Sequence, residues 1–159
     1  IARLIERAGA VVIEPWLDRR FDLGVCGVAG GPLQPPHGLS TDARGGFSGI
    51  DLGPPPLSPA EAAQLAEIAT RVSAALAAAG YAGPFGIDAF VHEDAGVRRL
   101  HPLCEINARH TFGHVARALG AARLGFGPPP PGATVVVAPA PDDPVTAWTL
   151  PSPPAAPGA

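Results

Sequence analysis

Oxygen-bearing side chains stand at regular spacing in two neighbouring apolar segments, 84–92 and 98–107. Asp88 lies in the first segment, and Glu105 and Asn107 lie in the second. Because successive side chains of a strand point to opposite faces, Glu105 and Asn107 share a face. A short turn-forming run joins the segments, so a hairpin would bring Asp88 near the level of Glu105. The pattern predicts two carboxylates and one amide oxygen on one face of a sheet.

This set of oxygens suits a hard divalent cation. Mg²⁺ or Mn²⁺ would take these ligands, with phosphate oxygens and water completing the octahedron. Two carboxylates held close together would repel each other without a cation. The alternative is that the same alternation only marks the solvent-exposed face of half-buried strands.

Five histidines offer further candidate ligands. His110 and His114, four positions apart, have the spacing of metal ligands on a helix face, but no third ligand of the zinc type accompanies them. We expect helix-entry and surface roles for this pair, with a contact from His110 to a second substrate left open. A substrate-facing role of His37, in a Gly/Pro-rich stretch, also stays open. His92 and His101 flank the hairpin and are expected to face solvent.

A helix over 58–79 is the clearest element that would support this sheet. Ser58 and Glu61 form a capping box, Pro59 takes the first helical position and Gly80 supplies the stop. The other predicted elements are helices over 1–8 and 112–124, strands over 10–17, 21–29, 47–52, 84–92 and 98–107, and a long loop over 30–46. This order predicts an α+β fold, with a mostly antiparallel sheet and helices packed on one face.

The composition excludes several classes of function. A net charge of −3 argues against nucleic-acid binding by phosphate neutralisation. All 11 basic residues are arginines, so neither a Schiff-base lysine nor a P-loop lysine is present. Cys26 and Cys104 are expected to be small apolar residues, with Cys104 on the face away from Glu105. No apolar run approaches 18 residues, so we expect no membrane span and a cytoplasmic location.

The last part of the chain differs in composition from the rest. Between positions 128 and 159, 11 of 32 residues are proline, which removes backbone donors. We expect a folded part over 1–127 and a largely disordered Pro/Ala-rich tail over 128–159, with a strand-like island over 133–138. Because the chain begins with Ile1 rather than Met, we expect a fragment that lacks its upstream part.

The hairpin region resembles a known superfamily. A Gly-x-Asp88-x-x-Val strand followed by Glu105-Ile-Asn107-x-Arg109 is similar to the C-terminal half of an ATP-grasp domain. The resemblance implies that Asp88, Glu105 and Asn107 hold the Mg²⁺ (or Mn²⁺) ions that bridge the ATP phosphates. It also implies that Arg109 faces the transferred phosphate or the acyl phosphate, a task that suits a permanently charged guanidinium.

The segment over 12–25 resembles the hinge of the same superfamily. By this resemblance, the backbone around Glu14 and Leu17 would flank the adenine, and Asp22 would contact the ribose. The lysines that clamp the phosphates in the superfamily belong to its other subdomain, for which the start at Ile1 leaves no room. We therefore expect a missing N-terminal half of the same protein as a partner.

The resulting functional expectation is a fragment of an ATP- and Mg²⁺-dependent ligase, inactive on its own. Such enzymes phosphorylate a carboxylate substrate with ATP, and an amine or thiol acceptor then displaces phosphate from the acyl phosphate. One alternative is a non-catalytic fragment or interaction module that lacks a complete nucleotide site. Another is a Mg²⁺-dependent phosphohydrolase that uses the same carboxylates.

Overall fold

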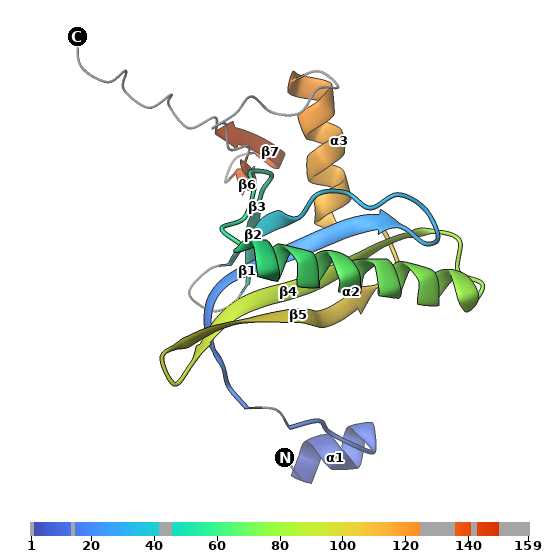
Figure 1. Ribbon diagram of the computed structural model, residues 1–159, viewed down its shortest axis with the longest axis vertical. Helices are drawn as coiled ribbons and strands as arrows, with labels where there is room; N and C mark the ends of the chain where they lie inside the picture. The colour runs from blue at the N-terminus through green and yellow to red at the C-terminus, as the bar shows by residue number, and fades with distance from the viewer. Residues whose placement is uncertain (1, 14, 42–45, 125–135, 141–142, 150–159) are drawn as a thin grey trace.

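Seven strands form one sheet in this computed structural model, which describes residues 2–13, 15–41, 46–124, 136–140 and 143–149 (Figure 1). The elements in chain order are α1 (Ala2–Ala8), β1 (Asp18–Val28), β2 (His37–Thr41), β3 (Phe47–Asp51), α2 (Pro59–Ala78), β4 (Pro84–Asp94), β5 (Val97–Asn107), α3 (Phe112–Leu124), β6 (Val136–Ala140) and β7 (Asp143–Thr149). The strand order is β5-β4-β1-β2-β3-β6-β7, and each neighbouring pair is antiparallel. The α+β class with an antiparallel sheet is confirmed.

The hydrophobic core lies between α2 and the central strands β1 and β4. Alternate residues of both strands point toward the helix, as the period of two predicts. The buried residues of this cluster are Leu23, Val25, Leu65, Ala69, Val72, Phe85, Ile87, Ala89 and Val91. Since these side chains occupy one face of β1 and β4, the intervening residues, Asp88 among them, are left for the opposite face.

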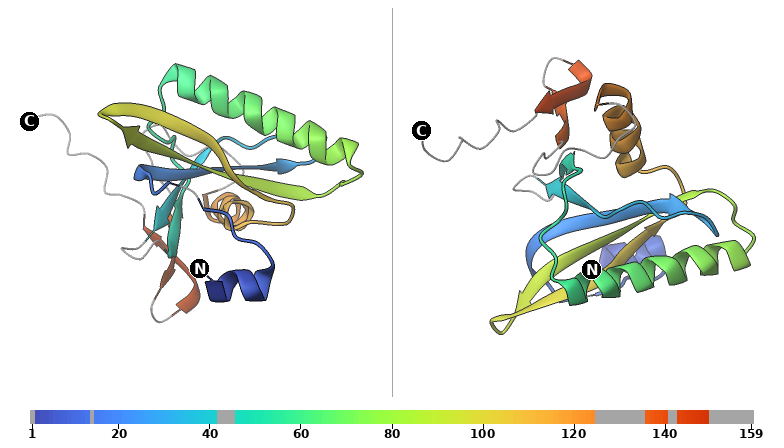
Figure 2. Two further views of the ribbon diagram at one scale, coloured as in Figure 1. Left: turned by 90° about the horizontal axis from the view of Figure 1, so that it is seen from below. Right: turned by 45° about the horizontal axis from the view of Figure 1, so that its top comes forward.

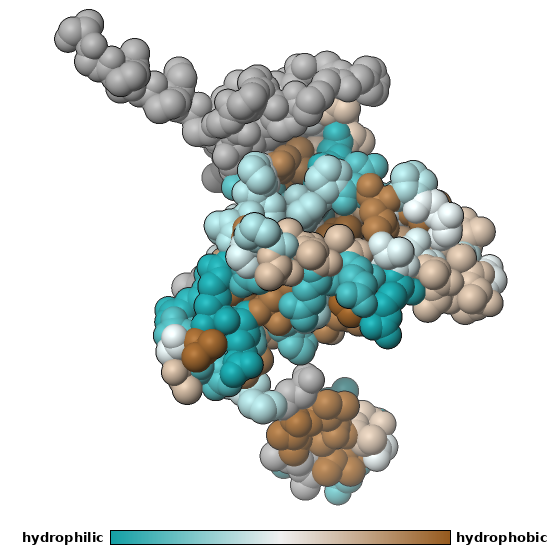
Figure 3. Space-filling view, in the orientation of Figure 1, coloured by the Kyte–Doolittle hydropathy of each residue, from teal (hydrophilic) through white to brown (hydrophobic). Residues whose placement is uncertain are grey.

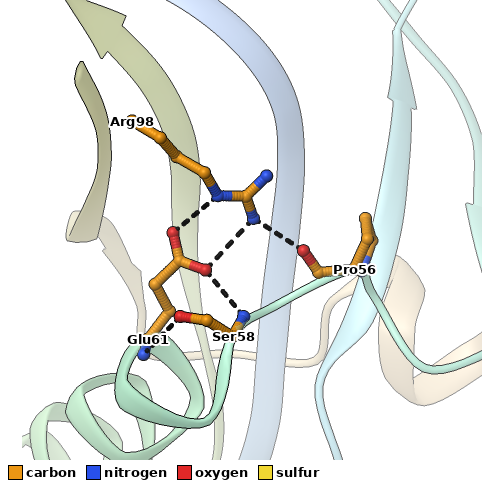
Figure 4. Close-up of polar contacts among 4 residues, drawn as sticks. All are labelled: Pro56, Ser58, Glu61 and Arg98. Atoms are coloured by element: carbon orange, nitrogen blue, oxygen red, sulfur yellow. Dashed lines mark hydrogen bonds and ion pairs between the residues drawn. The ribbon is translucent and has the colours of Figure 1, made fainter.

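The N-terminus of α2 is fastened to the β4–β5 hairpin (Figure 4). The Ser58 hydroxyl accepts the Glu61 amide at 3.3 Å, and the Ser58 amide donates to the Glu61 carboxylate at 2.7 Å. Arg98 of β5 donates to the same carboxylate at 2.9 and 3.1 Å and to the Pro56 carbonyl at 2.6 Å. The predicted capping box is confirmed, and it also ties the helix to the sheet.

The two longer helices do not share one face of the sheet, although we expected the helices to pack together on one face. Val25 of β1 faces α2, and the next residue, Cys26, points to the other side. There the N-terminal turn of α3 comes so close that a Cβ on Gly113 would lie 2.5 Å from the Cys26 sulfur. Figure 2 shows α2 and α3 on opposite sides of the strands. The second face is therefore partly covered by the start of α3.

The strand expected over 10–17 is absent from the structure. Residues 10–13 and 15–17 are assigned to no strand, and β1 begins at Asp18. Val12, Ile13 and Trp16 are 87%, 76% and 99% exposed. A β-branched run forms a strand when a neighbouring strand pairs with it, and in the described structure the pairing of β1 starts at Asp18. The helix α1 confirms the expectation for 1–8 and lies apart from the sheet (Figures 1 and 3).

Two strands lie where we expected none. β2 falls inside the predicted loop over 30–46, and it pairs with β1 and β3. In the tail, β6 overlaps the predicted island over 133–138, while β7 was not predicted. The other residues of 128–159 lie outside the described residues, so the boundary at 127 and the disorder of the tail stay predictions. No helix in the described part of the chain is long and apolar enough to cross a bilayer.

Candidate functional site

The predicted carboxylates and amide meet on the face of the sheet opposite α2. Asp88 of β4 lies directly across from Glu105 of β5, and Asn107 lies across from Gly86. The Asn107 side-chain amide donates to the Asp88 carboxylate at 3.2 Å. The predicted shared face is therefore confirmed by the register and by a direct contact. The role of these residues as metal ligands stays a prediction.

Arg109 extends this chain of contacts beyond the end of β5. Its guanidinium donates to the Asn107 side-chain oxygen at 2.8 Å and to the His110 carbonyl at 3.2 Å. Asn107 itself is 8% exposed. The Asn107 amide is therefore held between the Asp88 carboxylate and the Arg109 guanidinium, and Arg109 is the exposed member of the three.

The electrostatics of the site favour a bound cation. Burial raises the pKa of Asp88, and the Glu105 carboxylate raises it further, while Arg109 and the Asn107 amide oppose both effects. A divalent cation would relieve the repulsion between the two carboxylates. In the described part of the chain, no group of three or more His, Cys, Asp or Glu side chains forms a metal site. The protein would thus supply two carboxylates and one amide, which suits Mg²⁺ completed by phosphate and water oxygens.

Of the three residues expected at the nucleotide hinge, the structure brings Asp22 to the site. Asp22 pairs with Phe90 across β1 and β4, and one of its carboxylate oxygens is buried with no hydrogen bond in the described structure. That oxygen lies 3.4 Å from the Arg19 Nε in an ion pair. Leu17 is half-buried just before β1 and does not line the cavity described next. Glu14 lies outside the described residues.

The side chains of Asp22, Asp88, Glu105, Asn107 and Arg109 line one cavity of about 440 Å³, between the sheet and the start of α3. The volume is in the range of small-molecule sites. Its polar and charged lining consists of Arg19, Asp22, His37, Thr41, Asp88, Cys104, Glu105, Asn107, Arg109 and Thr111. The rest of its lining consists of Leu39, Phe47, Ile50, Ala89, Phe112 and Gly113. A second cavity of about 400 Å³ lies on the α2 side and is lined by apolar residues and Arg71.

Cys104 also reaches the main cavity, and the expectation that it faces away from Glu105 is wrong. The pairing of β4 with β5 shifts register between Asp88 and Phe90, which breaks the simple alternation of β5. Cys104 and Glu105 therefore line the same cavity, and the Arg19 guanidinium donates to the Cys104 sulfur at 3.7 Å. Alternation in the sequence carried no signal of this bulge.

His37 is a buried residue that lines the cavity, and the sequence alone does not decide its role. It is 2% exposed and lies between β1 and α3, where a Cβ on Gly24 would be 2.9 Å and one on Gly113 2.5 Å from its ring. Burial, with help from Arg117 and His114, lowers the pKa of His37 to about 4. Its buried Nδ1 finds no hydrogen-bond partner among the described residues. At neutral pH the His37 ring is therefore uncharged.

The other four histidines comprise a helix cap, a buried strand residue and two exposed residues. His114 accepts the Thr111 amide at 3.1 Å and so caps the first turn of α3, which confirms the helix-entry role. Its ring lies 5.4 Å from that of His110. His92 is 8% exposed, so the expectation that it faces solvent is wrong. His92 lies on the central strand β4, between Arg19 of β1 and Arg99 of β5, whereas His101 is exposed and stacks on Phe90.

Comparisons with known proteins found structural neighbours only. No family model and no curated protein matches the sequence. The fold is similar to that of carboxyaminoimidazole ribonucleotide synthase from Aspergillus clavatus, in a structure complexed with ATP (18% identity, TM-score 0.49, 77% of this chain and 35% of that chain). It is also similar to pyruvate carboxylase from Rhizobium etli (20% identity, TM-score 0.48, 64% and 9%) and to N5-carboxyaminoimidazole ribonucleotide synthetase from Thermus thermophilus (19% identity, TM-score 0.40, 62% and 25%).

The chain spans about a third of the length of the Aspergillus enzyme and less of the other two. At these identities and TM-scores, the likeness assigns no residue and no activity to this chain. Its function therefore has to be inferred from its own side chains.

Proposed function

We propose that this chain forms the metal- and phosphate-binding part of an ATP-dependent ligase of the ATP-grasp type. Such a ligase would join a carboxylate to an amine or thiol through an acyl phosphate. The observation that carries the proposal is the convergence of Asp88, Glu105, Asn107 and Arg109 in one cavity. Two carboxylates, an amide and a guanidinium are the groups that a metal–phosphate complex requires.

Each residue of the set has a distinct role in this proposal. Asp88, Glu105 and Asn107 would hold Mg²⁺ or Mn²⁺, which supplies positive charge to the phosphates of the bound nucleotide. Arg109 would donate to the oxygens of the transferred phosphate, where a planar guanidinium is well suited. Asn107 connects both tasks, because the oxygen that it would offer to a metal now accepts from Arg109.

The nucleoside part of the proposal rests on the resemblance and on Asp22. Asp22 lines the cavity, and its carboxylate would accept hydrogen bonds from the ribose hydroxyls. The backbone near Glu14 and Leu17 would flank the adenine. The chain has no lysine, so clamping of the phosphates would come from an N-terminal half of the same protein.

Two titrations test the proposal. Calorimetry with ADP in excess Mg²⁺ should show binding that requires the metal and weakens at least tenfold in Glu105→Gln. Electron paramagnetic resonance of free Mn²⁺ should show the same loss without any nucleotide. Glu67→Gln is the matched control, because Glu67 is exposed on α2, outside the cavity. Equal Mn²⁺ affinity of the wild type and Glu105→Gln would contradict the metal assignment.

An interaction module is the second candidate function. Two observations favour it, namely the absence of lysine and the exposure of Val12, Ile13 and Trp16 on an apolar segment outside the sheet. Such a module would bind neither Mn²⁺ nor Mg²⁺–ADP at the cavity. The titrations above therefore separate the two candidates directly. A phosphohydrolase would instead bind both and release phosphate from ATP without any acceptor.

A further inference from the structure

Two stacked aromatic rings stand at the apolar end of the main cavity. Phe47 of β3 and Phe112 at the start of α3 have ring centroids 4.7 Å apart and an interplanar angle of 10°. Both line the cavity, and they are 41% and 63% exposed. We call this pair the aromatic shelf. Large apolar side chains that stay exposed beside a cavity are typical of a ligand-binding surface.

Among the described residues, those of β2 and β3 that line the cavity beside the aromatic shelf carry no charge at pH 7. Leu39 and Ile50 line the cavity beside it, and Ile50 is 1% exposed. His37, the buried histidine of the same cavity, has its pKa lowered to about 4 by burial and is therefore neutral at pH 7. The cavity thus offers an apolar surface on this side.

The other end of the same cavity is charged. Asp88, Glu105 and Arg109 line it together with Asn107. Since one cavity of about 440 Å³ contains both ends, its ligand has two chemically different parts. The phosphates and metal of a nucleotide would match the charged end. Because the proposed function places the adenine at the backbone near Glu14 and Leu17, the aromatic shelf would remain for a different ligand. The matching occupant of the shelf is an apolar group attached to an anion that reaches Arg109.

We infer that the aromatic shelf is the specificity subsite for the carboxylate substrate, and that this substrate carries a flat apolar group. Its ring would pack against the outward faces and edges of the stacked pair Phe47 and Phe112, in the offset or edge arrangements that aromatic rings favour. Its carboxylate would pair with Arg109. The assignment of this ligand as the substrate rests on the proposed function, whereas its binding to the shelf does not.

Binding of simple acids to the full chain tests the inference. The probes are 3-phenylpropionate, propionate and 3-phenylpropionamide, each titrated calorimetrically in Mg²⁺ buffer. We expect 3-phenylpropionate to bind at least tenfold more tightly than propionate. Phe112→Ala should reduce this preference to less than threefold, and Phe112→Leu should keep part of it. Arg109→Gln should weaken the binding of the acid but not that of the amide.

The controls separate a local effect from unfolding and from failure of the ligase proposal. Val97→Ala removes an apolar side chain that is 52% exposed but lies outside the cavity, so it should leave all affinities unchanged. Two results with the wild type alone would overturn the inference. One is equal affinity for both acids, and the other is no detectable binding of 3-phenylpropionate at 10-fold molar excess over millimolar protein. Mg²⁺–ADP is titrated in parallel: binding of ADP without discrimination between the acids refutes the shelf alone, and discrimination without ADP binding refutes the ligase alone.

Discussion

Asp88 is the residue at which stability and binding oppose each other. Its pKa is raised in the folded chain by burial and by Glu105, so the folded state binds a proton more readily than the unfolded state. The stabilising effect of that proton is present at low pH and is lost as the pH rises through the folded pKa. At neutral pH the ionised Asp88 therefore destabilises the metal-free fold.

Replacing this charge should stabilise the fold and weaken binding. We expect Asp88→Asn to raise the free energy of unfolding of the metal-free chain at pH 7 and to weaken Mn²⁺ binding at least tenfold. Urea unfolding and a Mn²⁺ titration measure the two effects. The control is Asp94→Asn, which alters an exposed ion pair with Arg99 and should change neither. A metal-free Asp88→Asn chain less stable than the wild type would contradict the electrostatic account.

His37 makes the fold sensitive to mild acid. Its pKa is about 4 in the folded chain and 6.5 in a model peptide, so the unfolded state takes up a proton first as the pH falls. The free energy of unfolding should fall by about 3 kcal/mol between pH 6.5 and pH 4 from this group alone. Urea unfolding across this range should show a flatter profile in His37→Gln. His110→Gln, at an exposed position, should keep the slope of the wild type.

At the residue scale, the alternation of apolar and polar residues predicts the correct sheet face only where the strands pair regularly. Asp88, Glu105 and Asn107 were placed correctly because each lies where β4 and β5 are in simple register. Cys104 was misplaced because a bulge changes which face a residue occupies. Pro102 lies within the bulged stretch and is the local mark of it, but alternation alone does not use that mark. His37 has no distinctive neighbours in the chain, and its burial comes from Gly24 and α3, which are distant in sequence.

Among the elements, the link between α2 and the hairpin is the most readily tested. Glu61 serves as both half of the capping box and the partner of Arg98, and these contacts hold its pKa at about 2 (Figure 4). Glu61→Ala should lower the free energy of unfolding by about 1 kcal/mol, the usual loss for a helix cap. Arg98→Ala, which spares the Ser58–Glu61 contacts, should cost less. An equal loss in both variants would indicate that the ion pair matters more than the cap.

The elements that were predicted have local causes. The capping box, the Gly80 stop and the turn at Ala95-Gly96 each depend on residues only a few positions apart. Gly80, Ala95 and Gly96 all have positive φ. The strands that were missed depend on partners elsewhere in the chain. β2 is a five-residue strand with few β-branched residues, held between β1 and β3, and the exposed run over 10–17 lacks such a partner in the described structure.

For the whole molecule, the tail strands are expected to protect an edge of the sheet. β6 pairs with β3 at Ile50 and Asp51. A chain truncated after residue 127 should keep its core between α2 and β4, while the outer edge of β3 loses its partner. We expect faster hydrogen exchange at the β3 amides, unchanged exchange in β4 and unchanged Mn²⁺ affinity. Global loss of protection would show that the folded unit extends beyond residue 127.

The strand order also determines how long β1 lacks one of its neighbours while the chain is being synthesised. The β4–β5 hairpin closes across two residues, so Asp88 and Glu105 can approach each other as soon as both strands exist. β1, in contrast, has one edge covered by β2 and must wait for β4, which begins at Pro84, to cover the other. At about 5–20 residues per second, a ribosome needs roughly 3–11 s to make the 55 residues between Val28 and Pro84. During those seconds the nascent chain presents a central strand with an open edge, which makes this interval the natural point for a chaperone to act.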